Sequence, residues 1–315
     1  MLTLTFSAHD LGSIRFAFSP LREAVYSFRA LLRPAGRALH LPWLKRVSVS
    51  GLDLGPLVDL QADPTGYIPD FLTPSPSTPL PDLEVELATL AATPPEVVRA
   101  NLDTMAGPVP RDLYADPRAG MERLAAGVRA YWEVALAPHW PRMRGLLEGD
   151  VLFRSRQLAA RGPEGLFEGM HAALRWRDMR LELAERPAAY SRDLGGEGLL
   201  LVPSVFVWPR VSYKTEAPSQ PVIAYPARGL ATLWETGEAA TPDALAAVVG
   251  RSRALLLAQL EAPASTTELA RRTGLAAGTV SEQLGLLKAA GFVSARRVGR
   301  SVLYARTRRA EAMLG

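Results

Sequence analysis

Residues 265–304 read STTELARRTGLAAGTVSEQLGLLKAAGFVSARRVGRSVLY and contain the clearest structural pattern in the chain. Ser265 followed by Glu268 is the pattern of a capping box, so we expect a helix to begin there and to end at Gly274. A second helix is expected to run to about Ala290. Its apolar residues recur at i, i+4 and i+7, at Val280, Leu284 and Leu287. The spacing predicts two helices joined by a short turn.

A basic β-hairpin is expected to follow, with strands on either side of a turn at Val298-Gly299. It carries Arg296, Arg297 and Arg300 and no acidic residue. Helix pairs of this kind also serve as structural pieces, and basic hairpins are often solvated faces. Three features favour a DNA-binding role over a purely structural one: the capping pattern, the glycine-bounded turn and the absence of acidic residues in the hairpin. A helix sized for the major groove followed by a basic hairpin predicts a winged helix-turn-helix that binds DNA.

The distribution of charge agrees with this interpretation. Of 36 basic and 32 acidic residues in the chain, 11 and 5 fall within residues 242–315, a net charge of +6. The remaining 25 and 27 give residues 1–241 a net charge of −2. A basic module attached to a nearly neutral one is the pattern expected when only the module binds phosphates.

Residues 242–314 resemble the winged-helix domain of the ArsR family of bacterial transcriptional regulators. The second helix of that motif often reads Ser-x-x-Thr-Val-Ser-x-x-Leu-x-x-Leu, and the matching positions are Ala276, Thr279, Val280, Ser281, Leu284 and Leu287. The resemblance implies a cytoplasmic, homodimeric repressor that binds a double-stranded DNA operator. Ala276 replaces the usual serine cap, at a cost of about 1 kcal/mol to the helix. The chain has no cysteine, which excludes thiolate metal sensing, and neither a metal site nor a cofactor is expected.

The exposed face of residues 278–283 is expected to contact base edges, because Val280 is expected to be buried. Glu282 could accept from a cytosine amine and Gln283 could pair with adenine. The hairpin arginines would hold phosphates or enter the minor groove. The full predicted DNA-binding set is Gly278, Thr279, Ser281, Glu282, Gln283, Arg296, Arg297, Arg300, Ser301 and Tyr304.

The whole chain is expected to be an α+β protein of two domains. Residues 1–238 form a sensor or assembly domain, helical over 1–171 and β-rich over 172–236, with a small antiparallel sheet. Residues 239–315 form the winged helix. The proline-rich run TPSPSTPLP at 73–81 cannot be a helix or a central strand, so an ordered extended loop is expected there, with a disordered linker as the alternative. No transmembrane helix or signal peptide is expected.

The first 236 residues resemble a domain attached to ArsR-type winged helices in actinobacterial and related regulators. The resemblance is carried by YIPDFLTPSP (67–76), LAPHWPRMRGLLEGDVLFRSRQLA (136–159) and LLLVPSVFVWPRV (199–211). It implies a sensor or assembly role and no particular chemistry.

No catalytic residue is predicted in this larger part. The four histidines are widely spaced, and Ser204 lies in Val-Pro-Ser-Val-Phe rather than in a nucleophile elbow. Asp150 and Arg154 are four residues apart on a predicted helix. The pair could form a surface salt bridge, or it could anchor a ligand. We expect a small organic effector between residues 139–156 and 202–225, where aromatic residues and arginines meet. The candidate ligand-binding residues are His139, Trp140, Arg154, Phe206, Trp208 and Tyr225.

Two other functions stay open at this point. The chain could be an enzyme with an appended DNA-binding domain, or a DNA-binding architectural protein without an effector.

Overall fold

The computed structural model describes residues 1–33, 38–184, 190–215, 220–234, 242–260, 263–298, 301–307 and 309–311. The chain divides into two compact units, Met1–Trp234 and Glu235–Gly315, which we call the N-terminal and the C-terminal unit. The predicted domain boundary at residues 238–239 falls outside the described ranges.

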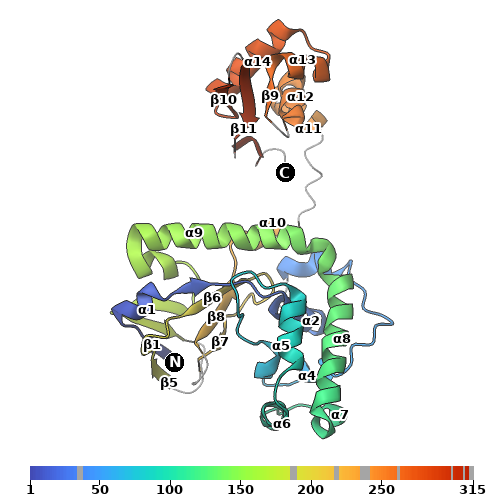
Figure 1. Ribbon diagram of the computed structural model, residues 1–315, viewed down its shortest axis with the longest axis vertical. Coiled ribbons are helices and arrows are strands. Elements are labelled where there is room, and N and C mark those ends of the chain that lie inside the picture. Colours follow the sequence, from blue (N-terminus) through green and yellow to red (C-terminus); the bar gives the residue numbers. More distant parts are fainter. Residues whose placement is uncertain are drawn as a thin grey trace. The chain divides into compact units, whose positions relative to one another are not determined.

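Helix α2 (Pro20–Leu32) lies at the centre of the helical half of the N-terminal unit. It begins at Pro20, after Ser19, whose hydroxyl accepts a hydrogen bond from the Arg22 amide at 3.1 Å. Helices α5 (Leu83–Ala91) and α8 (Pro117–Ala135) pack against it and against each other (Figure 1). Because neighbours cover α2 on several sides, even charged residues of this helix are buried.

Shorter elements connect these helices. Residues 73–81 contain neither helix nor strand, as the prolines predict. The short helices are α1 (Ala8–Gly12), η1 (Ala38–His40), α3 (Leu41–Leu44), α4 (Leu57–Leu60), η2 (Asp70–Leu72), α6 (Pro95–Asp103), α7 (Arg111–Ala115), η3 (Ala137–His139) and α10 (Leu230–Leu233).

Helix α9 (Trp140–Phe167) runs along one side of the unit, past both the helical layer and the sheets (Figure 1). The apolar pattern of the sequence predicts three separate helices here, at residues 140–147, 150–160 and 163–171, and the structure joins the first two into one continuous helix. The third is set off by Gly162, which has φ +64° and ψ −159°, followed by Pro163. Glycine reaches this conformation without steric cost, and proline cannot donate a helical hydrogen bond, so the helix breaks at this pair.

The N-terminal unit contains two mixed four-stranded sheets in its described part, which corrects the expected antiparallel sheet. The first has the order β3-β4-β1-β5, in which β1 pairs antiparallel with β4 and parallel with β5. The second has the order β2-β6-β8-β7, in which β6 pairs parallel with both β2 and β8. The strands are β1 (Leu2–Thr5), β2 (Arg15–Phe16), β3 (Leu174–Arg177), β4 (Arg180–Leu183), β5 (Tyr190–Asp193), β6 (Leu200–Ser204), β7 (Ser212–Lys214) and β8 (Val222–Pro226).

Strands β6 and β8 are buried on both faces, which explains why their sequences do not alternate between apolar and polar residues. One face, with Val202 and Ala224, packs against the cluster around α2 and α8. The other face, with Leu201 and Ile223, packs against the cluster that includes β1 and β4. The second sheet is therefore the layer that joins the helical half to the first sheet.

The C-terminal unit has the expected winged helix-turn-helix order around its own core. The elements are α11 (Pro242–Val249), α12 (Arg251–Gln259), β9 (Ala264–Ser265), α13 (Thr266–Thr273), α14 (Ala277–Ala289), β10 (Val293–Val298) and β11 (Ser301–Arg306). The apolar periodicity of residues 243–260 predicts a single helix there. It is interrupted at Gly250, whose φ of +89° and ψ of +146° lie outside the helical region.

Candidate nucleic-acid interface

Helix α13 and the turn after it form as the sequence predicts, except for half of the capping box. The Ser265 hydroxyl accepts from the Glu268 amide at 3.3 Å, and Gly274 ends the helix at φ +72°. The Glu268 carboxylate, however, accepts from the Arg272 guanidinium one turn later in the helix. The Glu268 carboxylate is therefore engaged in an ion pair and does not accept the second capping-box hydrogen bond, from the Ser265 amide.

Helix α14 has one buried face and one exposed face. Val280, Leu284 and Leu287 are buried in the core of the unit. The residues on the opposite side include Gly278 and Glu282, which are exposed. A helix of this length with a free face fits the major groove of B-form DNA.

The predicted base-contacting residues do not all share that exposed face. Gly278, Ser281 and Glu282 are exposed, whereas Thr279 and Gln283 are half-buried at its flank. The face also contains three residues that the prediction missed, Gly285, Leu286 and Ala289. Gly285 and Ala289 follow Gly278 and Glu282 by seven positions, so extending the helical period by two turns would have found them.

Strands β10 and β11 form the predicted hairpin, the wing. Arg296 and Arg297 are both exposed, but as successive residues of a strand they project from opposite faces. Arg297 lies on the same face as the buried Val293, and Tyr304, opposite Ala295, is half-buried on that face. The two arginines therefore present different directions to a DNA backbone. The predicted Arg300 and the side chain of Ser301 lie outside what the structure describes.

A further basic residue of the wing is structural. The Arg306 guanidinium donates to the carbonyl oxygens of Leu257 and Ala258, at 2.6 Å each, and so ties β11 to the last turn of α12. These carbonyls are among those a helix leaves unsatisfied at its C-terminus. Arg306 thus contributes to the position of the wing, and two of its three guanidinium nitrogens are engaged within the protein.

Helix α14 lacks a side-chain cap, which suggests a stabilising change. Ala276 at the N-cap has extended backbone angles (φ −61°, ψ 140°), and no side-chain hydrogen bond caps the helix. Ala276→Ser is expected to stabilise the helix by about 1 kcal/mol, because the hydroxyl can accept from a free amide of the first turn. Amide hydrogen exchange in α14 should slow accordingly. Ala277→Ser, one position inside the helix, is the control and should give no protection.

The residues predicted to bind an effector do not form one site. Arg154 is 1% exposed and donates to the carbonyl oxygens of Leu166 and Glu168, at 3.2 and 2.9 Å. Its neighbour Asp150 accepts from the Tyr225 hydroxyl at 2.8 Å. Arg154 and Tyr225 therefore belong to a buried polar network that fastens α9 to the chain after its break and to strand β8.

The other four candidates lie within or beside the helical core. Trp140 packs edge-on against Trp132, with ring centroids 5.1 Å apart, and His139 packs against Trp234 at 5.6 Å. Phe206 is fully buried, and Trp208 is partly buried against the same cluster. The unit contains a pocket between α2 and residues 206–215, and of the six candidates only Phe206 lines it. The sequence interpretation did not find this pocket.

Two further findings concern the described part of the chain. None of its helices combines the length and the apolar character needed to cross a membrane. It also contains no cluster of three or more histidine, cysteine, aspartate or glutamate residues suited to hold a metal ion.

The helix-turn-helix, its free helix face and its basic wing together define a DNA-binding domain of the winged-helix class. Residues 251–295, from α12 into β10, match the family described as bacterial regulatory protein, arsR family. The chain thus carries an ArsR-family helix-turn-helix near its C-terminus, the DNA-binding domain of a transcriptional regulator. A search of curated proteins and a search of solved structures gave no match to the chain.

Proposed function

We propose that the protein is a cytoplasmic, homodimeric, sequence-specific repressor that releases its operator when a small organic effector binds the N-terminal unit. The ArsR-family match over residues 251–295, together with the free face of α14, carries this proposal. A dimer follows from the small footprint of one module, because a single recognition helix contacts only a half-site. The N-terminal unit contributes the sensor rather than a catalytic activity.

The affinity for DNA should depend steeply on salt. Arg296, Arg297 and Arg300 from two protomers could neutralise about six phosphates, so the slope of log K against log salt concentration should be about −5. A filter-binding or fluorescence-anisotropy titration over 50–300 mM salt (about the range in which such slopes are measured) checks this. A flat dependence would exclude the wing from the interface.

The wing and the recognition helix should affect specificity differently. Arg297→Ala is expected to weaken binding to all sequences about equally, because a phosphate contact carries no base information. Glu282→Ala or Gln283→Ala should instead change the preferred bases. Selection of binding sites from random DNA with each variant measures both effects. Arg251→Ala, which removes an exposed arginine of α12, is the matched control for charge.

The opposite pattern in that selection would contradict the assignment. If Arg297→Ala changed the base preference and both helix variants left it unaltered, the hairpin would read the sequence and α14 would only position it. Since Gln283 is half-buried and Glu282 exposed, Glu282→Ala should have the larger effect of the two.

A further inference from the structure

The N-terminal unit contains a pocket with a volume of about 610 Å³ that lies between α2, residues 66–73 and residues 206–215. This volume is within the range of small-molecule sites in proteins. Four aromatic residues line it, namely Tyr26, Tyr67, Phe206 and Tyr213. The pocket can therefore enclose a molecule with an apolar, planar body.

The charge of the pocket is strongly positive. Five cationic side chains line it, from Arg22, Arg29, Arg33, Arg210 and Lys214, and Asp70 is the single acidic residue among its described lining. Ion pairs within the described part of this unit involve none of Arg22, Arg33, Arg210 and Lys214. A concave site lined by one sign of charge concentrates ligands of the other sign.

Arg22 is the most costly of these cations to hold in place, because it is 1% exposed. Its two terminal nitrogens donate to the Tyr26 hydroxyl and to the Thr73 carbonyl, at 3.2 and 2.9 Å. Its Nε, also buried, has no hydrogen-bond partner among the described residues. Buried arginines are normally paired with an anion, since an uncompensated buried charge is strongly unfavourable.

Two buried carboxyl groups, those of Glu23 and Glu86, interact with Arg22 through charge, but neither forms an ion pair with it among the described residues. Burial raises the pKa of Glu23 and of Glu86 to about 7, although hydrogen bonds and Arg22 itself oppose the rise. Burial therefore favours the uncharged form of both carboxyl groups more than in an exposed glutamate. Their oxygens are also engaged elsewhere, by the amides of Val205 and Phe206 and by Ser19 and the amide of Leu21.

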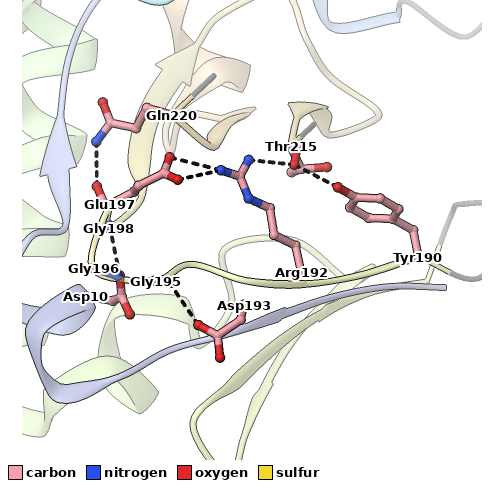
Figure 2. Close-up of polar contacts among 10 residues, drawn as sticks. All are labelled: Asp10, Tyr190, Arg192, Asp193, Gly195, Gly196, Glu197, Gly198, Thr215 and Gln220. Carbon is pink, nitrogen blue, oxygen red and sulfur yellow. Dashed lines mark hydrogen bonds and ion pairs between the residues drawn. The ribbon is translucent and has the colours of Figure 1, made fainter. Parts of the chain in front are cut away.

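A second buried polar atom of the lining is left without a partner. Thr215 is 2% exposed, and its Oγ1 makes no hydrogen bond within the described residues. Its backbone is firmly held, since Arg192 and Tyr190 both donate to the Thr215 carbonyl oxygen, at 2.8 and 3.3 Å (Figure 2). Arg192 is held in turn by both oxygens of Glu197. Buried groups without a partner are rare and cost stability, and here two residues that line the same pocket each contain one.

We propose that this pocket binds a small organic anion, in which a carboxylate or phosphate group meets Arg22, Thr215 and the surrounding cations. The apolar body of the molecule lies against the aromatic residues. The role of this anion as the effector that releases DNA rests on the function proposed above, whereas its binding does not.

Isothermal titration of the full chain with three matched probes tests the binding. The probes are 1-naphthoate, 1-naphthyl phosphate and the neutral 1-naphthamide, which share the aromatic body and differ in the charged group. The anions should bind at least about tenfold more tightly than the amide, the effect of one charge-assisted hydrogen bond. Tighter binding of the phosphate or of the carboxylate identifies which oxyanion the pocket prefers. Equal dissociation constants for all three, or no binding of any, would overturn the proposal.

Two variants locate the site. Thr215→Val removes the unpartnered hydroxyl at nearly constant shape, so it should weaken the preferred anion about tenfold and leave the melting temperature of the free protein unchanged or raised. The double variant Arg210→Gln, Lys214→Gln should weaken the anion about fivefold and leave the amide unaffected. Arg118→Gln, which removes an exposed arginine on α8, is the control and should change neither. Wild-type anion affinity in both pocket variants would place the binding elsewhere and overturn the proposal.

The effect of the anion on DNA affinity distinguishes a failure of the anion site from a failure of the proposed function. The preferred anion is added to the protein on its selected DNA sequence, with and without Thr215→Val. Release that Thr215→Val suppresses supports both ideas. Binding of the anion without any change in DNA affinity sustains the pocket as an anion site and removes it as the effector site. If the protein binds its DNA sequence specifically but binds none of the anions, the anion site is excluded and the proposed DNA-binding function stands.

Discussion

Arg154→Ala is expected to lower the free energy of unfolding of the N-terminal unit by about 3–5 kcal/mol, the usual cost of leaving a buried charge without its partner. The substitution removes the guanidinium that satisfies the Leu166, Glu168 and Gly169 carbonyl oxygens beyond the break in α9. It also leaves Asp150, whose side chain is fully buried, without its cation. Urea unfolding followed by tryptophan fluorescence measures the effect, since all six tryptophans lie in residues 1–234.

Helix α9 contains its own control for this experiment. Arg144 and Glu148 have the same i, i+4 spacing as Asp150 and Arg154, in the reverse order of charge, with atoms 2.7 Å apart. Both side chains are about half exposed, so Arg144→Ala should cost less than about 1 kcal/mol. If the two variants cost the same, the buried network is not what fixes α9. If Arg154→Ala abolished anion binding while leaving stability intact, Arg154 would be the ligand anchor that the sequence left open.

The C-terminal unit was predictable because its signals act over short distances in the chain. A serine cap, a left-handed glycine and an i, i+4, i+7 apolar stripe specify α13, the turn and most of α14 within about 25 residues. The errors there are also local. The Gly250 break was missed because apolar residues continue on both sides of it, and Glu268 has a competing partner in Arg272.

The sheets of the N-terminal unit were not predictable at the same level. Strands β1 and β2 come from the first 16 residues and pair with strands about 180 residues later, and no local pattern encodes such partners. The buried runs of β6 and β8 did contain a usable signal. Strands without alternation are typical of parallel sheets covered on both faces, so the small antiparallel sheet was the poorer interpretation.

The basic pocket was missed because its key residue lies in a helix that looks amphipathic. The helical spacing of Leu21, Val25, Phe28 and Leu32 predicts a single buried stripe on α2, which places Arg22 on the solvent side. In the structure Leu32 is 42% exposed and Arg22 is buried, because residues 73–74 and the loop after β6 cover that side. Helical periodicity reveals an apolar face, but it does not reveal a second face that is covered by other parts of the chain.

The turn before β6 determines the second large effect. Gly198 has φ +69°, its amide donates to the Asp10 carboxylate at 3.0 Å, and a Cβ there would lie 2.4 Å from the Ser13 carbonyl oxygen. Gly198→Ala should therefore cost about 3 kcal/mol or more, from the left-handed backbone and from displacement of the Ser13 backbone. Gly195→Ala is the matched control, with φ +60° and nothing within 4 Å of the added carbon, and should cost about 1 kcal/mol.

Gly198→Ala should also affect ligand binding in the pocket. Gly198 follows Glu197, which binds Arg192, and Arg192 in turn donates to the Thr215 carbonyl oxygen (Figure 2). A shift of this turn would weaken the hydrogen bonds that hold the Thr215 backbone, even at temperatures at which the unit remains folded. We therefore expect Gly198→Ala to weaken 1-naphthoate binding at 10 °C (about the temperature of maximum stability), and Gly195→Ala to leave it unchanged. If the folded Gly198→Ala protein binds 1-naphthoate as tightly as the wild type, the position of Thr215 does not depend on this turn. If the two glycine variants lower the free energy of unfolding equally, the Ser13 backbone moves aside without a measurable cost.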